Sequence, residues 1–236
     1  MNYLKIAVLN NSGNVGKSTI CQTFLMPRID QAELIRVETL NHDGVDTDGL
    51  SSKDMTLVIQ KIDMVNKAVI DVGSSNIENF MAGLKRNSGS HEDIDFYIVP
   101  TTPEVKQQKD TVTTVDSLID IGVNPSSIFV ILNKTDELGT IERQYQTILD
   151  ADIVATLEKK SISDFPTIFE SEIFNLLEKI QCSFMDVLND STDYKKEIRA
   201  TDDKELRSIL SIKRTANRLA KSHYEKMNFE FSKFLP

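Results

Sequence analysis

The fold of this chain is decided by the stretch NNSGNVGKST at residues 10–19. An apolar run at residues 4–9 precedes it and is typical of a short buried strand. Residues 20–26 follow it with the apolar spacing of a helix, up to Pro27. A strand, a glycine-containing turn that ends in Gly-Lys-Ser and a helix form a phosphate-binding arrangement, because backbone N–H groups and the positive helix end face the anion. The alternative is a capped helix start that contains a lysine by chance.

The residue types in this loop predict how a nucleoside triphosphate would be bound. Lys17 is expected to reach the β- and γ-phosphates, Ser18 to bind a magnesium ion, and Thr19 to lie near the α-phosphate. The usual first glycine of the Walker A pattern would fall at Asn11. The backbone N–H groups expected to surround the phosphates belong to Gly13, Asn14, Val15 and Gly16.

Length and composition favour a globular chain with one α/β domain, or one domain and a small appendage. The chain has 236 residues, of which 40% are hydrophobic and 27% are charged. No apolar stretch approaches the length of a membrane span, and residues 4–9 are too few for a signal peptide. Cys21 and Cys182 lie far apart without metal-ligand spacing, which argues against a disulfide framework or a zinc site. We therefore expect a cytoplasmic protein.

Charge is unevenly distributed along the chain. The net charge is −9, yet residues 204–236 carry eight Lys or Arg against three Glu, a net +5, so residues 1–203 carry −14. An acidic body repels nucleic acid, so any contact with DNA, anionic lipid or an acidic protein is expected to involve the basic tail.

Apolar runs with strand character alternate with amphipathic helical runs as far as residue 180. Strands are predicted at residues 4–10, 34–40, 68–72, 96–100, 128–133 and 167–169. Helices are predicted at residues 17–26, 53–64, 77–86, 103–121, 141–159 and 171–188, the fourth with Thr102 as its N-cap. This alternation predicts a doubly wound α/β fold with a mostly parallel sheet, whose ligands bind at the carboxyl ends of the strands. We expect a nucleotide-binding domain over residues 1–190 and a helical extension over residues 191–236.

Two strand ends carry carboxylates that suit a magnesium–triphosphate site. Asp71 ends the third predicted strand, where a carboxylate accepts a hydrogen bond from a magnesium-bound water, and Gly73 lets a backbone N–H approach the γ-phosphate. Glu38, near the end of the second strand, is placed to orient the attacking water. The alternative for Asp71 is that it only caps a turn. The alternatives for Glu38 are that Asp43 or Asp46 takes this role, or that the segment after Glu38 is only a solvated turn.

The strand end at residues 133–136 reads Asn-Lys-Thr-Asp and predicts contacts with the base of the nucleotide. The amide of Asn133 can bond to the edge of a purine, and the stem of Lys134 can cover its ring. Asn-Lys-x-Asp has the form by which GTPases bind guanine, with Asp136 accepting hydrogen bonds from N1 and the exocyclic amine. Such a site discriminates strongly, because the wrong base leaves buried polar groups unpaired. GTP is therefore an alternative to ATP.

With these motifs the chain resembles the ParA/MinD group of ATPases, which have a deviant Walker A motif. Within that group it resembles plasmid stability StbB proteins and conjugation-associated TraL proteins. The resemblance runs from residue 4 to about residue 188, and it rests on residues 10–19, 71–73 and 99–104. It implies a SIMIBI-like P-loop fold, ATP and magnesium, nucleotide-dependent dimerisation, and a role in moving or positioning DNA or protein cargo.

Three positions depart from the pattern of this group. The signature lysine, which reaches the partner's phosphates across the dimer, falls at Ser12; the second glycine of a pair falls at Asn14; and the usual aspartate falls at Glu38. The neutral hydroxyl of Ser12 cannot stabilise the charge that develops on the γ-phosphate, as a cation would. We therefore expect weak intrinsic hydrolysis, and Ser12 argues against the sandwich homodimer of the group.

From residue 204 to about residue 231 the pattern is helical, with an apolar stripe opposite a basic face. The stripe contains Leu206, Ile209, Leu210, Ile212, Ala216, Leu219, Ala220 and Met227. The basic face contains Arg207, Arg214, Arg218 and Lys221. Packing on the sheet is the favoured role of this helix, ahead of docking of DNA or a protein through the basic face. Membrane association, suggested by a resemblance to the tail of MinD, ranks last.

The favoured function is a slow magnesium-dependent ATPase that acts as a molecular switch. Its partner is expected to be a plasmid partition or conjugation protein, itself able to bind DNA. The second interpretation is a nucleotide-binding adaptor without useful turnover, which Ser12 favours. The third is a small-molecule kinase or ligase on the same fold, although the sequence has no obvious clamp for a substrate carboxylate.

Overall fold

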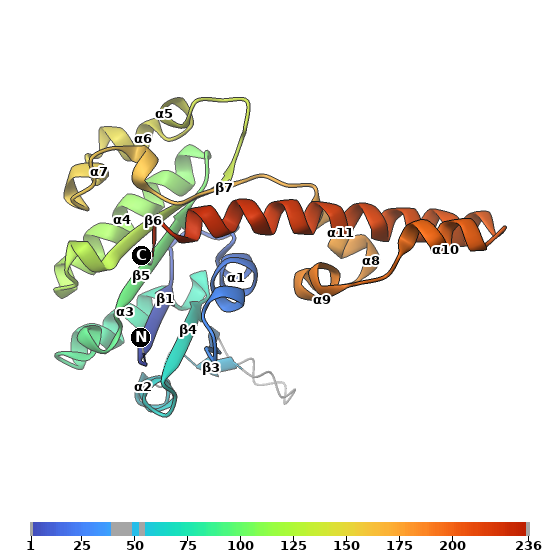
Figure 1. The fold of residues 1–236 in the computed structure, drawn as a ribbon. Helices are drawn as coiled ribbons and strands as arrows, with labels where there is room; N and C mark the ends of the chain where they lie inside the picture. The colour runs from blue at the N-terminus through green and yellow to red at the C-terminus, as the bar shows by residue number, and fades with distance from the viewer. Residues whose placement is uncertain (1, 39–48, 52–54, 235–236) are drawn as a thin grey trace.

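The computed structural model describes residues 2–38, 49–51 and 55–234, which contain one parallel sheet. Within these residues the sheet has seven strands in the order β3-β2-β4-β1-β5-β6-β7, with β1 at its centre (Figure 1). Every adjacent pair of strands is parallel. The strands are β1 (Leu4–Val8), β2 (Glu33–Glu38), β3 (Gly49–Ser51), β4 (Lys67–Val72), β5 (Phe96–Thr101), β6 (Ile128–Thr135) and β7 (Thr167–Phe169).

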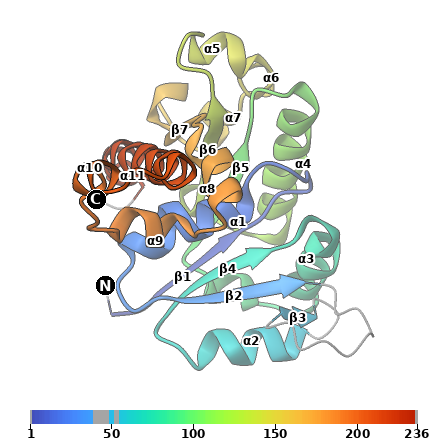
Figure 2. The same ribbon diagram turned by 90° about the vertical axis from the view of Figure 1, so that its right-hand side faces the viewer.

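Helices connect these strands and cover both faces of the sheet (Figure 2). The helices before β6 are α1 (Lys17–Thr19), α2 (Met55–Asp63), α3 (Ile77–Arg86) and α4 (Val105–Ile121). The helices after β6 are α5 (Ile141–Gln144), α6 (Gln146–Asp150), α7 (Ile153–Thr156), α8 (Ile173–Ile180), α9 (Phe184–Asn189), α10 (Tyr194–Ala200) and α11 (Lys204–Phe231). The predicted doubly wound α/β fold is confirmed.

Side chains of the central strand alternate between two hydrophobic cores, because successive residues of a strand point to opposite faces. Ala7 belongs to the core that α2 to α7 cover, whereas Ile6 and Val8 belong to the core beneath α1, α8, α9 and α11. All three side chains are fully buried. Burial of an aliphatic side chain such as Ile6 contributes about 1.5–3 kcal/mol, so β1 and the loop that follows it are firmly positioned.

The segment after the phosphate loop is not the regular α-helix predicted over residues 17–26. α1 continues as a π-helical segment, Ile20–Leu25, and then as a 3₁₀ turn, Met26–Arg28. Pro27 lies at the start of this 3₁₀ turn, where the missing N–H of proline is tolerated. The helical path therefore passes Pro27 rather than ending before it.

The single helix predicted over residues 141–159 is wrong, because this segment forms α5, α6 and α7. The first break is at Tyr145, whose hydroxyl bonds to the carbonyl of Asn133 and to the hydroxyl of Thr135 at the end of β6. The second break is at Asp152, whose φ of +55° interrupts the helical hydrogen bonds. A contact with a distant strand thus overrides the local helical pattern.

Other predicted boundaries also change. Residues 171–188 form α8 and α9, separated at Gln181 with φ +51°, and a capping box from Ser183 starts α9. α4 begins at Val105 with Glu104 as its N-cap, so the predicted cap at Thr102 is wrong. β3 and α10 were not predicted from the sequence.

α11 has the predicted bounds and forms a long arm (Figure 1). Asp203 caps it by accepting hydrogen bonds from the backbone N–H groups of the first turn. Its second half packs on the core, where Ala216 and Met227 are buried. Its first half extends beyond the sheet beside α10, and there Ile209 is 50% exposed, so the predicted stripe is buried only in part. No helix among the described residues is both long enough and apolar enough to cross a membrane.

Candidate functional site

The phosphate loop connects the carboxyl end of β1 to α1, and its backbone is held in a fixed curve by β6. Gly16 has φ +84°, and a Cβ atom there would lie 2.4 Å from Nδ2 of Asn133. Asn133 donates this amide to the carbonyl of Val15 (2.8 Å), and the ammonium of Lys134 donates to the carbonyl of Asn14 (3.1 Å). Only glycine satisfies both the backbone conformation and the close approach at position 16.

Lys17 is buried inside this loop. Its ammonium donates hydrogen bonds to the carbonyls of Ser12 (2.7 Å) and Asn10 (3.2 Å). Burial lowers the pKa of Lys17, while the negative charge of Asp71 raises it. Carbonyls of the loop therefore hold the cation within the chain, at the position where the sequence predicts contacts with phosphate oxygens.

Asp71 and Ser18 meet at the carboxyl ends of β1 and β4. The hydroxyl of Ser18 donates to the carboxylate of Asp71. Burial raises the pKa of Asp71, whereas the hydrogen bond from Ser18 and the charge of Lys17 lower it. A hydroxyl and a carboxylate in contact are the groups that hold magnesium beside a phosphate, directly or through water. The residues predicted as magnesium ligands thus lie together.

Among the described residues, no group of three or more His, Cys, Asp or Glu side chains is arranged to hold a metal ion. Magnesium does not need such a cage, because it keeps several waters and binds one or two protein oxygens together with phosphates of the nucleotide. The Ser18–Asp71 pair is sufficient for that mode of binding.

Gly73 lies close to the neighbouring strand. Its N–H donates to the carbonyl of Val37 (3.1 Å), and a Cβ atom there would lie 3.1 Å from Nδ2 of Asn76. To sense a γ-phosphate, as the sequence predicts, this N–H must leave Val37. Glu38 ends β2 opposite Ser51 of β3, and Asp43 and Asp46 lie outside the described residues.

A cavity of about 580 Å³ opens from the phosphate loop toward the ends of β6 and β7. We call it the nucleoside cavity. Its lining residues are Gly16, Thr19, Asn133, Lys134, Thr135, Asp136, Glu137, Phe169, Glu170, Ser171, Glu172, Phe174 and Asn175. One end is therefore formed by loop and helix residues predicted to bind phosphate, and the other by the Asn-Lys-Thr-Asp sequence predicted to bind the base.

A comparison with models of known protein families gives no match, and a sequence comparison with curated proteins gives none. Apo McdA from Cyanothece matches in structure with a TM-score of 0.54 and 12% identity, over 97% of this chain and 99% of that chain. The septum site-determining protein MinD of Pyrococcus horikoshii, complexed with Mg-ADP, matches with a TM-score of 0.50 and 12% identity, over 94% and 98%. The chain has the ParA/MinD fold. The predicted resemblance is confirmed at the level of the fold.

In this ParA/MinD fold, the base end of the nucleoside cavity is held by two residues that the sequence analysis missed. Gln144 accepts from the backbone N–H of Asp136 (2.8 Å) and donates to its carbonyl (2.9 Å). Tyr145, the next residue, holds Asn133 and Thr135 through its hydroxyl. No signal in the sequence distinguishes these residues from other members of an amphipathic helix, because their partners lie on β6 or just after its end.

A second cavity, of about 540 Å³, lies on the other side of the loop and was also not predicted. We call it the α3 cavity. Its lining residues are Asn11, Ser74, Ser75, Ile77, Glu78, Met81, Thr114 and Ser117. The backbone N–H of Asn11 donates to the hydroxyl of Thr114 (3.1 Å), which joins the loop to α4. The phosphate loop of this ParA/MinD fold thus has a cavity on each side.

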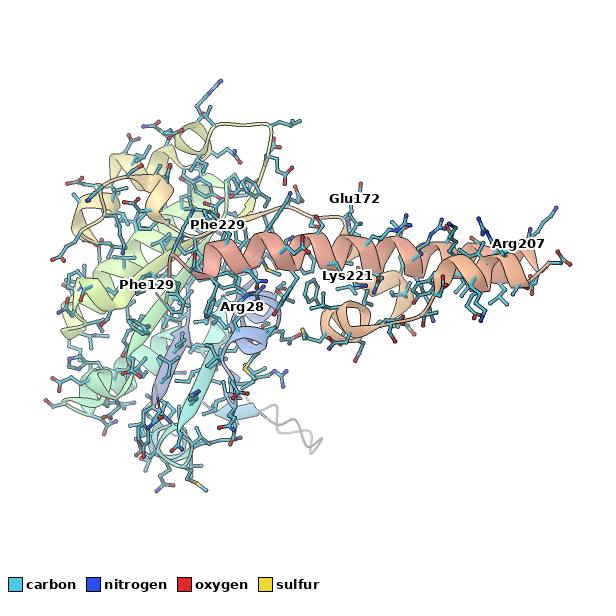
Figure 3. All side chains as sticks on the ribbon, viewed as in Figure 1. Arg28, Phe129, Glu172, Arg207, Lys221 and Phe229 are labelled. Carbon is cyan, nitrogen blue, oxygen red and sulfur yellow. The ribbon has the colours of Figure 1, made fainter. Side chains whose placement is uncertain are left out.

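The four predicted docking cations lie on α11. Arg207 is near the free end of the arm and pairs with Asp202 (3.2 Å), and Lys221 is near the middle of the helix (Figure 3). Arg214 is half-buried, and its Nε has no hydrogen-bond partner among the described residues. Arg218 and Lys221 are exposed. The structure therefore leaves the cations in unequal environments along one face.

Proposed function

We propose that this protein is a nucleotide-dependent molecular switch that binds a nucleoside triphosphate with magnesium and hydrolyses it slowly. The observation that carries the proposal is the arrangement of Lys17, Ser18 and Asp71 around one loop whose curve is enforced by Asn133. Backbone N–H groups, a buried ammonium and a hydroxyl–carboxylate pair are the groups that a magnesium–triphosphate requires.

Each residue of the site has a separate role in binding the magnesium–triphosphate. Lys17 binds the β- and γ-phosphates, and Ser18 binds magnesium, with Asp71 accepting from a water on the metal. The bound magnesium neutralises charge on the phosphates. Gly73 senses the γ-phosphate by giving up its bond to Val37, and that movement of the β4 end changes the surface presented to a partner.

Slow turnover follows from Ser12. Hydrolysis spreads negative charge over the γ-phosphate oxygens, and cations that meet this charge lower the barrier. Ser12 is buried and uncharged, and its carbonyl accepts from Lys17. It offers the phosphates no second cation. An adaptor that binds nucleotide without useful turnover is the limiting case of the same interpretation.

ATP is the nucleotide that the resemblance implies, and the MinD structure of the same fold is complexed with Mg-ADP. GTP is a second candidate because Asp136 lines the nucleoside cavity with its backbone fixed by Gln144. A carboxylate there accepts from the N1–H and amine of guanine, whereas N1 of adenine is an acceptor and would be repelled. Thermal shift with each nucleotide, for the parent and Asp136→Ala, decides between them: a GTP-specific shift that Asp136→Ala removes supports GTP.

The partner is proposed to be a plasmid partition or conjugation protein, itself able to bind DNA. The support is the basic face of α11, with Arg218 and Lys221 exposed on an otherwise acidic chain, and the resemblance to StbB and TraL proteins. Replacement of Arg214, Arg218 and Lys221 by Glu is expected to abolish binding of DNA or of such a partner. Unchanged binding contradicts a docking role for this face.

Lys17→Ala tests the central claim. The parent is expected to bind ATP or GTP with magnesium, and the variant to lose this binding because the only ammonium inside the loop, as described, is removed. Lys85→Ala, on the exposed surface of α3, is the matched control and should bind as the parent does. Binding is measured by titration with a fluorescent nucleotide. Equal binding by Lys17→Ala, or no binding by the parent, would overturn the proposal.

A further inference from the structure

A third cavity, of about 520 Å³, lies between α11 and residues 167–172, which form β7 and the start of the connection to α8. We call it the α11 cavity. Its other lining residues are Glu137 and seven residues of α11 between Leu219 and Glu230. It adjoins the nucleoside cavity, because residues 169–172 line both. The phosphate loop, residues 10–19, contributes none of its described lining residues, so the two sites are distinct.

The floor of the α11 cavity is apolar. Ile168 and Met227 are buried in it, and Leu219 is half-buried. Phe229 also lines the cavity, yet its side chain is 67% exposed. Cavities of this size with mostly apolar walls are typical of binding sites, because covering them removes apolar surface from water.

The rim of the α11 cavity is acidic. The lining contains four glutamates against one lysine, a net charge of −3. Glu137 and Glu230 each pair with a lysine. Glu170 and Glu172 are exposed and have no ion pair among the described residues. The cavity therefore suits an occupant that combines apolar side chains with positive charge.

The end of the long arm has this combination of properties. We call residues 194–215 the distal arm; they comprise α10 and the first half of α11, which extend beyond the sheet (Figure 1). Leu206 is 42% exposed and Ile209 is 50% exposed. The distal arm contains seven Lys or Arg against four Asp or Glu, a net charge of +3, although the whole chain is acidic. Its exposed apolar residues and its charge are thus complementary to the α11 cavity.

The distal arm of a chain cannot reach the α11 cavity of the same chain. α11 is one continuous helix from Lys204 to Phe231, and it carries both features. At a rise of about 1.5 Å per residue, Leu206 lies about 20 Å along the helix from Leu219, the first α11 residue of the cavity. Figure 3 shows Arg207 near the free end of this helix and Phe229 near the sheet. The occupant must therefore come from another molecule.

We propose that the distal arm of one copy of this chain docks into the α11 cavity of a second copy, and that two copies exchange arms to form a dimer. Each copy has one distal arm and one α11 cavity, so a two-fold axis satisfies both contacts and leaves none for a third copy. Leu206 and Ile209 contact the apolar floor, and cations of the distal arm lie beside Glu170 and Glu172. This dimer needs no nucleotide, because the phosphate loop takes no part in it.

A change to the distal arm tests one side of the contact. Sedimentation equilibrium without nucleotide should show a dimer of the parent whose dissociation constant rises with salt concentration, because salt screens exposed charges. Leu206→Glu combined with Ile209→Glu should raise this constant at least about 100-fold, because it places carboxylates against an apolar floor and an acidic rim. Met64→Glu, whose parent side chain is 84% exposed just after α2, is the control and should dimerise as the parent does.

A change to the cavity tests the other side. Ser222 is exposed and lines the α11 cavity, so the indole of Ser222→Trp fills space that the distal arm needs. We expect this variant to lose the dimer as well. Ser126→Trp, exposed before the start of β6, is the matched control and should keep it. Circular dichroism and urea unfolding of each variant identify a protein that has not folded.

Mixing the two variants distinguishes exchanged arms from any other interface. The double glutamate variant keeps a normal α11 cavity, and Ser222→Trp keeps a normal distal arm. One of the two contacts can therefore form between them, although neither variant can form it with itself. We expect native mass spectrometry to show a heterodimer, weaker than the parent dimer because one contact replaces two.

Several results would overturn the inference. They are a parent that is monomeric at about 100 μM, a dimer that appears only with nucleotide, and a dimer that both variants leave intact. Folded, monomeric variants that do not associate when mixed would also overturn it. Each of these measurements is made without testing nucleotide binding by Lys17, so the proposed function stands or fails separately.

Discussion

The nucleoside cavity is built from side chains that already hold one another, whereas the described residues that line the α3 cavity include no lysine or arginine. On the nucleoside side, Asn133 and Lys134 bond to the loop, and Gln144 fixes both backbone groups of Asp136. On the α3 side, the lining offers hydroxyls and Glu78. The nucleoside side of the loop is therefore held in place by contacts within this chain.

A preorganised nucleotide site suits the proposed switch. A protein that binds nucleotide tightly but hydrolyses it slowly stays in the bound state until another molecule ends that state. In the proposed switch, nucleotide affinity depends on the preorganised nucleoside side of the phosphate loop. Variants on the nucleoside side should therefore change affinity.

The largest effect is expected from Gly16→Ala. The added Cβ atom would approach Nδ2 of Asn133 to 2.4 Å, and φ +84° is unfavourable for alanine. We expect the free energy of unfolding to fall by about 1–3 kcal/mol and nucleotide affinity to fall at least about 100-fold. Gly89→Ala is the control, because it has φ +90° with no atom within 4 Å of the added Cβ.

Urea unfolding and nucleotide titration measure these two quantities. Gly89→Ala should also lower the free energy of unfolding, because its backbone conformation is unfavourable for alanine, but it should bind nucleotide with the affinity of the parent. If both variants bound nucleotide equally well, the preorganisation of the nucleoside side by Asn133 would be disproved.

A smaller effect is expected from His223, which supports the wall of the nucleoside cavity. Its ring packs edge-on against Phe174 (5.4 Å between centroids), and Phe174 lines the cavity. Burial, with smaller contributions from Lys226 and Arg28, lowers the pKa of His223 from 6.5 to about 4. The folded protein therefore binds fewer protons at this site than the unfolded chain, so stability present above pH 6.5 is lost as the pH falls toward 4.

The loss attributable to His223 is at most about 3 kcal/mol. His223→Phe should remove that part of the acid sensitivity, measured as the difference in unfolding free energy between pH 7 and pH 4.5. His91→Phe, at the amino end of the sheet, should retain the full loss. An identical pH dependence for the parent and His223→Phe would show that the buried imidazole plays no part.

The smallest effect is expected from Gln144→Ala. The two hydrogen bonds to the backbone of Asp136 contribute about 1 kcal/mol each, so nucleotide affinity should fall about 5–30-fold. Affinity for inorganic tripolyphosphate should not change, because the hydrogen bonds of the Gln144 side chain are to Asp136 and Thr140, outside the phosphate loop. Gln146→Ala, whose side chain bonds to Asp150 on the exposed face, is the control. A parallel loss of affinity for tripolyphosphate would mean that the whole site, and not its base end, depends on Gln144.

Several features of the fold followed from local sequence patterns. Five strands of the sheet lie within about two residues of their predicted bounds, β7 lies at its predicted residues, and α3 and α11 also have their predicted bounds. These elements have clear apolar periodicity and distinct end signals. The predictions failed for residues 141–159 and 171–188, where Tyr145 and Gln181 interrupt helical patterns that have no breaking residue.

The candidate site was accessible to sequence reasoning in part. The loop, Asp71 and the residues from Asn133 to Asp136 follow strands, and parallel strands bring their carboxyl ends to one edge of the sheet. The sequence could therefore predict that these residues lie close together. Their roles in nucleotide binding stay predictions. Gln144 and Thr114 could not be found, because each is one polar residue among many on a helix. Gln144 bonds to the backbone of Asp136 just after β6, and Thr114 bonds to the backbone of Asn11, 103 residues away in the chain.

The sequence alone determined the presence of a phosphate loop between a strand and a helix, the α/β class and the absence of a lysine at position 12. Each of these three features depends on residues that are neighbours in the sequence, because their identity sets the spacing of apolar side chains and the chemical groups available. The tertiary structure decided that β6 fixes the curve of the loop, that one cavity is supported by Gln144, and that the other has no cation among its described lining residues. Those properties depend on how the strands and helices pack together, as for Asn133 and Val15, which are 118 residues apart in the chain and share a hydrogen bond. The packing of the sheet and helices sets such contacts, and the local sequence pattern does not predict them.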